Sequence, residues 1–301
     1  MTTRVRNYTY PHDFGRVSDF LVQHYQPDNR DGNWLQPAWE YMHSHPALDE
    51  SVLDRIGIWE DAGEIVAVVH YEMALGEAFF QIHPGYPHLK PEMLSYAQER
   101  LFGRSDTDQR YVRVYINDFD PEFAALARSR GYSRTPDYDR PLSRFALPDP
   151  FPEITLPDRF RLQSLQDDND LNKIDRVLWR GFDHEGEPPA ESIEDRKKMQ
   201  SGPSFRQDLN VVVKAPEGHF VSYSGTWFEG THRYAYVEPV ATDPDYRRRG
   251  LGKAAVLEGL RRCCELGATV AYVGSDLAFY LAIGFEIVHT SQCWTKYLDS
   301  A

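Results

Sequence analysis

The sequence predicts an α/β (α+β) fold made of two tandem domains, each with a mixed, mostly antiparallel sheet flanked by helices. Two observations lead to this prediction. The same order of elements occurs twice along the 301 residues, and a proline-rich stretch separates the two copies. A chain of this length exceeds one typical domain. Its 41% hydrophobic residues supply enough apolar material for two cores.

Three landmarks recur at a nearly constant offset. Each half contains a hairpin pattern around a glycine turn, then a strand followed by Pro-x-Tyr, then a small helix that ends in Gly and an aromatic residue. The paired positions stand 155, 160 and 153 residues apart: Gly63 with Gly218, Tyr86 with Tyr246, and Gly131 with Gly284. This constant order indicates an internal duplication.

The proline-rich stretch reads LPDPFPEITLP over residues 147–157. Four prolines in eleven residues disfavour a helix and favour an extended connector. The predicted boundaries are therefore 1–145 for the first domain, 146–157 for the linker and 158–301 for the second domain. Within the second domain, apolar residues at helical spacing predict a helix around Leu171–Leu178, and the polar stretch 189–200 predicts another.

Composition narrows the classes of function. The formal net charge of -13 argues against general nucleic-acid binding, which needs a basic surface. The three cysteines, Cys263, Cys264 and Cys293, make no disulfide framework and fit a reducing compartment. The first residues lack the apolar core of a signal peptide, and no apolar run is long enough to span a membrane. We therefore expect a cytoplasmic protein with no nucleic-acid, membrane or metal partner.

A strand over residues 234–241, a loop, and a helix that begins near Leu251 and stops near Gly267 are predicted in that order. In the loop, Gly250 and Gly252 let backbone N–H groups approach a ligand closely. The start of the helix offers unpaired donors and the positive end of a dipole. Four cations add charge at the same place: Arg247, Arg248, Arg249 and Lys253. The pattern predicts a binding site for a diphosphate.

Two well-known phosphate-binding motifs fit this loop poorly. A Walker phosphate loop needs a glycine at position 247 and a Ser or Thr at 254, where Arg and Ala stand. Gly250-x-Gly252-x-x-Ala255 matches a loose dinucleotide fingerprint, but the polar stretch 242–249 separates it from the strand. A glycine-bearing helix start with a solvated arginine cluster is the remaining alternative to a diphosphate site.

The motif Arg247-x-x-Gly250-x-Gly252, preceded by Pro244-x-Tyr246, resembles the acetyl-CoA loop of the GNAT superfamily of N-acetyltransferases. The segment Tyr280–Phe285 resembles the closing Tyr-x-x-x-Gly-Phe of that family. The resemblance covers residues 158–298 well and 1–145 in outline, and it points to a tandem member with mycothiol-synthase-like architecture. It implies acetyl transfer from acetyl-CoA, as co-substrate, to the amine of a small acceptor. The residues implied to hold the coenzyme are Val240, Ala241, Arg247, Arg248, Arg249, Gly250, Leu251, Gly252 and Lys253.

The resemblance also implies three residues that take part in the chemistry. Glu238 stands where the family often keeps a general base, and Tyr280 stands where it keeps a general acid, four residues before Gly284. A phenol with a pKa of about 10 can protonate a leaving thiolate. Pro239 cannot donate to a sheet ladder, so the strand should part from its neighbour there. The N–H of Val240 then becomes the candidate donor to the oxyanion. An exposed strand carboxylate and a packed core tyrosine are the structural alternatives for Glu238 and Tyr280.

The acceptor is harder to place. Trp179 and Phe182 lie where the first helix of the second domain ends, a region that shapes the acceptor pocket in the family, and Trp227 lies on a strand that could face the same cleft. Core packing is the alternative for each aromatic residue. The family often has an Asn before the catalytic tyrosine, and this chain has none there. We expect Ser275 or Asp276 to cap that helix instead.

The first half is predicted to be degenerate and non-catalytic. Aligned on the shared tyrosine, Lys90 and Glu92 replace the two loop glycines, and Ala127 replaces Tyr280. A carboxylate repels a diphosphate, so we expect one coenzyme site per chain. The alternatives to a general amine acetyltransferase are a mycothiol-synthase-like enzyme that acetylates a thiol-sugar amine, and a non-catalytic regulator that binds acetyl-CoA.

Overall fold

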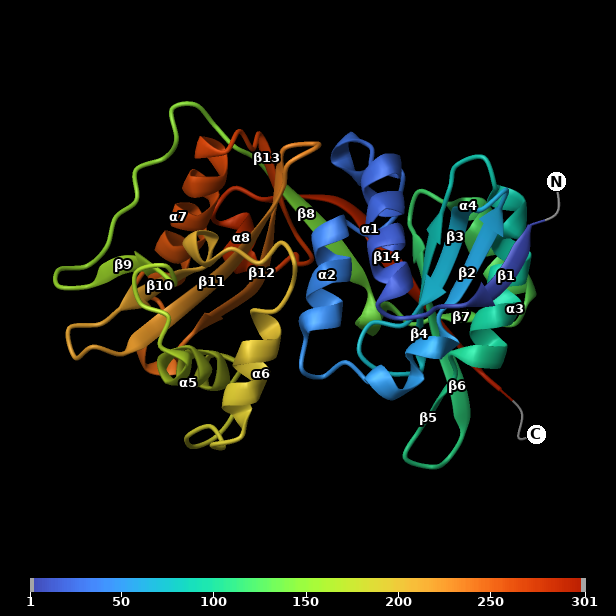
Figure 1. The fold of residues 1–301 in the computed structure, drawn as a ribbon, viewed down its shortest axis with the longest axis horizontal. Coiled ribbons are helices and arrows are strands. Elements are labelled where there is room, and N and C mark those ends of the chain that lie inside the picture. Colours follow the sequence, from blue (N-terminus) through green and yellow to red (C-terminus); the bar gives the residue numbers. More distant parts are fainter. Residues whose placement is uncertain (1–2, 299–301) are drawn as a thin grey trace. The chain divides into compact units, whose positions relative to one another are not determined.

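The computed structural model describes residues 3–298 and divides into two compact units. Unit 1 comprises the residues up to Met42, Ala47–Leu142 and the residues from Ile287 onward. Unit 2 comprises His43–Pro46 and Ser143–Glu286. Each unit has a mostly antiparallel sheet flanked by helices (Figure 1), which confirms the predicted fold class.

Unit 1 has the strand order β1-β2-β3-β4-β6-β14, with β5 beside β6 and β7 beside β14. Its strands are β1 (Arg4–Asn7), β2 (Gly57–Asp61), β3 (Glu64–His70), β4 (Glu77–Ile82), β5 (Gly103–Arg104), β6 (Arg110–Asn117), β7 (Ser133–Arg134) and β14 (Glu286–Tyr297). Its helices are α1 (His12–His24), α2 (Gln36–Ser44), α3 (Lys90–Arg100) and α4 (Pro121–Ser129), with 3₁₀ turns η1 (Pro27–Asn29), η2 (Glu50–Arg55), η3 (Pro87–Leu89) and η4 (Pro136–Tyr138). The pair β4–β6 is parallel, and the other neighbouring pairs of this unit are antiparallel.

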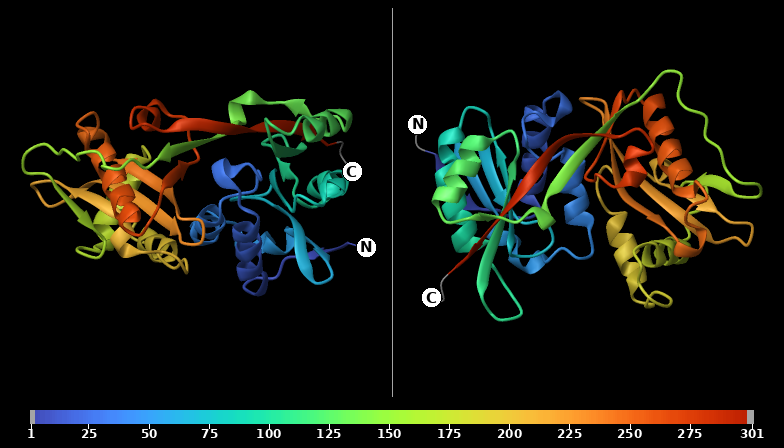
Figure 2. Two further views of the ribbon diagram at one scale, coloured as in Figure 1. Left: turned by 90° about the horizontal axis from the view of Figure 1, so that it is seen from above. Right: turned by 180° about the vertical axis from the view of Figure 1, so that it is seen from behind.

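Unit 2 has the strand order β8-β13-β12-β11-β10-β9. Its strands are β8 (Arg140–Ala146), β9 (Arg161–Ser164), β10 (Val211–Lys214), β11 (Phe220–Glu229), β12 (Tyr234–Thr242) and β13 (Val270–Val273). Its helices are α5 (Leu171–Gly181), α6 (Ser192–Met199), α7 (Leu251–Glu265) and α8 (Ala278–Leu281), with 3₁₀ turns η5 (Gln207–Leu209) and η6 (Pro244–Tyr246). Helix α7 covers one face of this sheet, and α5 with α6 covers the other (Figure 2).

Helix α7 packs closely on the sheet because a glycine, Gly259, faces the strands. A Cβ atom at Gly259 would lie 2.3 Å from Oγ1 of Thr226 on β11, so only glycine permits this approach. Apolar residues of the same helix, including Val256 and Leu260, are buried against the strands. The helix ends at Glu265, and Gly267 follows with a φ of +99°, a conformation that favours glycine. This packing fixes the start of α7 next to the end of β12.

The two halves of the sequence exchange their last strands. The first half ends in β8, which joins the sheet of unit 2, and the second half ends in β14, which joins the sheet of unit 1. In unit 1, β14 pairs with β6 and aligns Trp294 with Val114. In unit 2, the residues Ser143–Ala146 of β8 pair with β13 and align Phe145 with Ala271. The predicted boundaries at 1–145 and 158–301 do not capture this exchange. Alternating hydrophobicity shows that a strand is half-buried, but it does not specify which sheet edge the strand joins.

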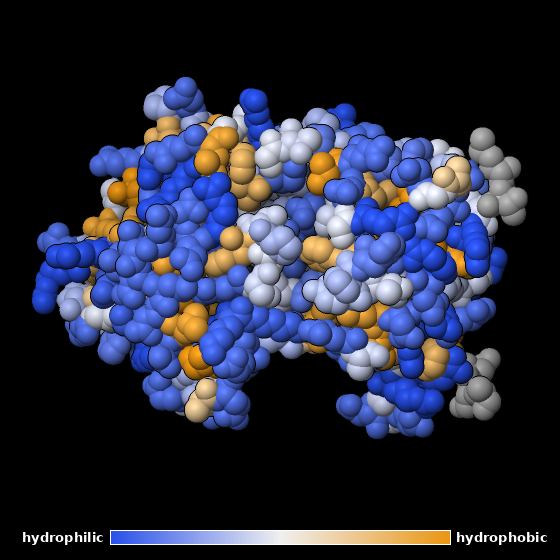
Figure 3. Space-filling view, viewed as in Figure 1, coloured by the Kyte–Doolittle hydropathy of each residue, from blue (hydrophilic) through white to orange (hydrophobic). Residues whose placement is uncertain are grey.

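The surface is mostly hydrophilic on the face seen in Figure 3, where hydrophobic residues form small, separate patches. In the part of the chain that the structure describes, no helix is both long and apolar enough to cross a membrane.

Candidate functional site

A cavity of about 480 Å³ opens in unit 2 beyond the point where β12 and β13 stop pairing. The parallel pairing of these strands ends at Tyr236 with Tyr272, whereas β12 continues to Thr242. The cavity walls come from the end of β12, the first turn of α7, α8 and the end of α5. The predicted coenzyme-binding residues that line it are Val240, Ala241, Arg247, Arg248, Gly250, Leu251, Gly252 and Lys253.

The two loop glycines have different structural roles. Gly250, the residue before α7, has a φ of +80°, which L side chains rarely adopt. A Cβ atom at Gly252 would lie 2.9 Å from Oγ1 of Thr242 and 3.3 Å from the ring of Phe279. No side chain of the described residues caps the start of α7. The first backbone N–H groups of this helix are therefore available to an anion in the cavity.

The four cations of the loop have different surroundings. Arg247 lines the cavity but is already held by Asp183, at 2.8 Å, and by the carbonyl of Gly181, at 2.9 Å. Arg249 does not line the cavity. Its guanidinium donates to the carbonyl of Asp245 at 3.1 Å.

The other two cations, Arg248 and Lys253, are exposed and line the cavity. Among the residues 3–298, neither side chain makes a hydrogen bond or an ion pair. Arg248 and Lys253 are therefore the charges most available to a bound anion.

Glu238 lies on β12 and forms hydrogen bonds with Tyr236 and Trp227. The hydroxyl of Tyr236 donates to its Oε2 at 2.5 Å, and the indole N–H of Trp227 donates to its backbone carbonyl at 2.9 Å. The register with β11 shifts between Ser224 and Thr226, opposite this part of the strand. The irregularity expected next to Pro239 is therefore present.

Tyr280 lies in α8 and lines the cavity with only 8% of its surface exposed. The rings of Phe279 and Phe285 contact it edge-on, with centroids 4.9 and 5.7 Å away. Burial raises the pKa of Tyr280 above its ordinary value, and the charge of Glu238 raises it further. The phenol therefore stays protonated at neutral pH and has a proton to donate. No side chain caps α8, although the hydroxyl of Ser275 accepts from the N–H of Leu277 at 3.2 Å.

The three predicted acceptor residues do not line this cavity. Trp179 stacks on His184, with ring centroids 4.3 Å apart, and Phe182 is 53% exposed. Trp227 is buried, and its link to the site is the hydrogen bond to Glu238. The structure thus brings Trp227 next to Glu238 and leaves the other two on the segment at the end of α5.

Asp243 is a residue of this region that the sequence did not single out. Its side chain is 1% exposed, and Arg180 and Arg176 of α5 lie 2.7 and 3.3 Å from it. Burial alone would raise the pKa of the Asp243 carboxyl. The hydrogen bonds from Arg180 and the backbone of Asp245, together with the positive charges of Arg180 and Arg176, outweigh the effect of burial and lower the pKa. The Asp-Pro pair before η6 was the available signal, because aspartate commonly accepts from nearby backbone N–H groups; here it accepts from Asp245.

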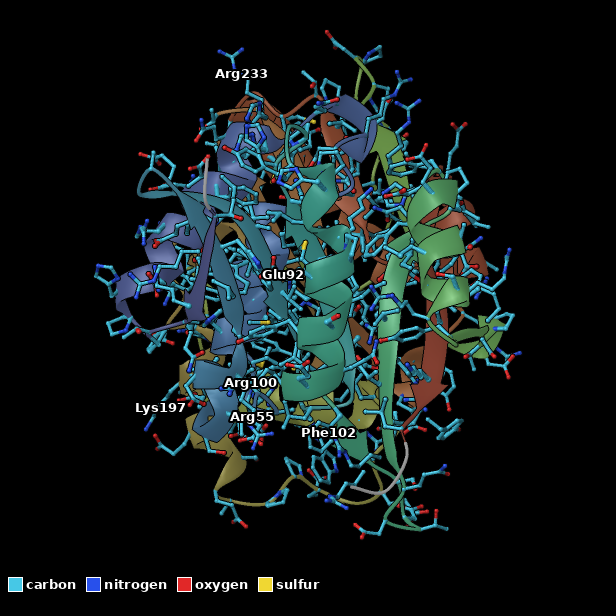
Figure 4. The ribbon with its side chains drawn as sticks, turned by 90° about the vertical axis from the view of Figure 1, so that its right-hand side faces the viewer. Arg55, Glu92, Arg100, Phe102, Lys197 and Arg233 are labelled. Carbon is cyan, nitrogen blue, oxygen red and sulfur yellow. The ribbon has the colours of Figure 1, made fainter. Side chains whose placement is uncertain are left out.

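The corresponding place in unit 1 is nearly filled. The cavity there has a volume of about 70 Å³. Lys90, at the start of α3, pairs with Asp120 at 2.6 Å, and Glu92 accepts from the indole N–H of Trp59 at 3.0 Å; Figure 4 shows Glu92 on α3. Between β4 and β6, a stacked pair of aromatic rings, Phe79 and Tyr115, occupies the space with centroids 4.5 Å apart.

In residues 3–298 the structure shows no cluster of metal-ligating side chains and no exposed cysteine. No group of three or more His, Cys, Asp or Glu side chains in that range could hold a metal ion. Cys263 and Cys293 are free and buried, and burial raises their pKa values to about 12 and about 11. At neutral pH these thiols are protonated and unreactive.

Known proteins resemble both the sequence and the fold. Residues 171–285 match the model of the Acetyltransferase (GNAT) family. Over 248 residues the chain is 26% identical to the mycothiol acetyltransferase of Saccharomonospora viridis, a match that covers 76% of this chain and 78% of that protein. Over 142 residues it is 29% identical to an uncharacterized N-acetyltransferase of Escherichia coli K12, a match that covers 44% of this chain and 78% of that protein.

Among solved structures, a tandem GNAT protein from the clavulanic acid biosynthesis pathway matches with a TM-score of 0.67 at 15% identity, over 100% of both chains. A GCN5-related N-acetyltransferase from Sphaerobacter thermophilus matches with a TM-score of 0.65 at 16% identity, over 99% of this chain and 96% of that one. At these identities the likeness concerns the fold, and it extends over both units.

Proposed function

We propose that the chain, a tandem, mycothiol-synthase-like member of the acetyltransferases of the GNAT family, transfers the acetyl group of acetyl-CoA to the amine of a small acceptor. The observation that carries the proposal is the cavity of unit 2. It combines an uncapped helix start, two glycines and two available cations with the protonated hydroxyl of Tyr280. The helix start, the glycines and the cations fit a diphosphate, and the hydroxyl of Tyr280 fits a thioester elsewhere in the same ligand.

In this proposal the coenzyme diphosphate lies at the start of α7. Gly250 and Gly252 allow the backbone N–H groups to approach it, and Arg248 and Lys253 supply charge. The pantetheine arm enters where β12 runs on beyond the last residue paired with β13, along Val240 and Ala241.

The chemistry is a direct transfer. The acceptor ammonium first loses a proton to solvent, and its neutral nitrogen bonds to the acetyl carbon as the carbon–sulfur bond breaks. Glu238 takes the second proton that the nitrogen loses on becoming an amide, and then releases it to solvent. The N–H of Val240 donates to the thioester oxygen, on which negative charge develops. Tyr280 gives its proton to the departing sulfur and regains one from solvent.

For the acceptor we propose a small, cationic amine. The net charge of -13 attracts cations, and Trp227 lies beside Glu238. Trp179 and Phe182 are proposed as further contacts on the segment at the end of α5. The curated relatives named mycothiol acetyltransferases favour a second candidate, a thiol-sugar that presents an amine.

A screen of coenzyme A release would test the activity. The acceptors are amino acids, polyamines, aminoglycosides, peptides and amino sugars bearing a thiol. We expect turnover with a small amine, which Tyr280→Phe and Glu238→Gln reduce. For a cationic acceptor, KM should rise with ionic strength.

Two outcomes of the screen would contradict the proposal. If acetyl-CoA binds but no acceptor releases coenzyme A, the chain is a regulator rather than an enzyme. If only peptides or protein tails are acetylated, the acceptor class is wrong.

A further inference from the structure

Arg247 has an anionic partner in a loop that adjoins the cavity. Its Nη2 atom lies 2.8 Å from Oδ1 of Asp183, while its Nε atom donates to the carbonyl of Thr242 at 3.1 Å. The side chains of Arg247 and Asp183 are 41% and 67% exposed. Water screens an ion pair of this kind and limits its strength. A more highly charged anion in the cavity could therefore take the place of Asp183.

The end of α5 is anchored to the end of β12 more firmly than Arg247 is bound to Asp183. Asp243 is almost fully buried and binds Arg180, which also pairs with Asp245 at 2.7 Å. Gly181 lies so close to β12 that a Cβ atom there would be 2.6 Å from Cβ of Ala241. Because these contacts are buried or close-packed, we expect α5 to keep its place when a ligand binds.

The loop of residues 182–187, which follows α5, is held more loosely. His184 stacks on Trp179 of α5, whose indole N–H donates to the carbonyl of Glu185 at 3.1 Å. The backbone N–H groups of Asp183 and His184 also donate to carbonyls of α5, at 3.0 and 3.2 Å. In the described part of the chain, its ion pairs to other elements are Asp183–Arg247 and a longer contact of 3.5 Å between Glu187 and Arg176. Beyond its contacts with α5, the loop is therefore tied to the rest of unit 2 through Arg247.

We propose that Arg247 exchanges Asp183 for the coenzyme diphosphate, which makes Asp183 a positioning residue that transmits coenzyme occupancy to the loop 182–187. This inference rests on the proposed function. A diphosphate offers a planar guanidinium several charged oxygens, and the start of α7 stabilises the anion. The released loop contains Phe182, a proposed acceptor contact, so coenzyme binding would change the acceptor side of the site.

The test compares two neutral substitutions in the same loop of the full-length protein. Asp183→Asn removes the partner of Arg247. Glu187→Gln removes the same charge without touching Arg247, and so corrects for the general effect of charge on a polyanion. Calorimetry with acetyl-CoA gives Kd, and hydrogen exchange of the segment 182–187 gives the loop response.

We expect Asp183→Asn to lower Kd for acetyl-CoA about two- to fivefold relative to Glu187→Gln, because no ion pair has to be broken. Coenzyme should speed hydrogen exchange of the loop in the wild type and in Glu187→Gln. In Asp183→Asn the loop should already exchange fast and show no further response. In an Arg247→Gln background, Asp183→Asn should change Kd no more than Glu187→Gln does.

Three results would overturn the inference. If Asp183→Asn matches Glu187→Gln in both measurements, or weakens binding, Asp183 does not compete with the coenzyme. Slower loop exchange in the coenzyme complex of the wild type would also contradict partner exchange. A wild-type protein that does not bind acetyl-CoA would overturn the proposed function together with this inference, whereas the preceding results would leave the proposed function intact.

Discussion

The hydroxyl of Tyr236 donates a 2.5 Å hydrogen bond to Oε2 of Glu238, two residues further along β12. Residues two apart on a strand point to the same face, so the strand itself brings the phenol to the carboxylate. Tyr236 is thus placed to orient the carboxylate of the proposed base.

Replacing Tyr236 should slow the reaction. In Tyr236→Phe the carboxylate of Glu238 loses this donor and is held less firmly, so kcat/KM should fall about tenfold. Glu238→Gln should lower kcat/KM further. An unchanged kcat/KM in Tyr236→Phe would show that the hydrogen bond does not position the base.

Tyr280→Phe should lower kcat by a factor on the order of 10²–10⁴, because the departing sulfur loses its proton donor. Since the ring remains, Kd for acetyl-CoA should change little. The raised pKa of Tyr280 also predicts that its ionisation produces no loss of activity below about pH 10. Steady-state kinetics and calorimetry on the same preparation would check both parts. A parallel loss of binding would assign Tyr280 to packing instead of chemistry.

Two neighbouring arginines offer a matched pair for the coenzyme site. Arg248 lines the cavity, whereas Arg249 does not. Arg248→Glu should weaken acetyl-CoA binding at least about tenfold by placing a negative charge near the diphosphate. Arg249→Glu makes the same charge change and should have a much smaller effect. Equal effects in calorimetry would mean that only the overall charge of the loop matters.

The exchanged strands predict which fragments of unit 2 fold. Phe145 of β8 packs against Phe285, with ring centroids 5.4 Å apart, and lies in the apolar cluster that includes Tyr280. A fragment of residues 140–286 keeps β8 and should bind acetyl-CoA. A fragment of residues 158–286 lacks β8, exposes the edge of β13 and should aggregate or fail to bind. Binding by the shorter fragment in a thermal-shift assay would show that β8 is dispensable.

The sequence predicted those parts of the fold that depend on local pattern. The helix around Leu171–Leu178 appears as α5, the polar stretch 189–200 contains α6, and both hairpins form. β9, with the sequence Arg-Leu-Gln-Ser, is short and lacks a clear alternation, so its sequence does not predict a strand. Nor did the sequence predict the exchange of β8 and β14, because pairing between distant strands depends on tertiary contacts that no local pattern encodes.

For the candidate site, the motif drew attention to the loop 247–253 but did not predict the state of its side chains. Gly250 and Gly252 line a cavity, and coenzyme binding there stays a prediction. The partners of Arg247 could not be predicted, because Asp183 is 64 positions away in the chain and the charge of the loop suggested four equivalent cations. The roles of Glu238, Val240 and Tyr280 stay predictions, as do those of the proposed acceptor residues.

We expect one coenzyme site per chain, in unit 2, and titration calorimetry with acetyl-CoA tests this expectation most directly. The cavity of about 480 Å³ in unit 2, against about 70 Å³ at the matching place in unit 1, predicts a stoichiometry near one. That single binding event should be strongly weakened by Arg248→Glu. A stoichiometry near two, or binding that Arg248→Glu leaves intact, would contradict the account.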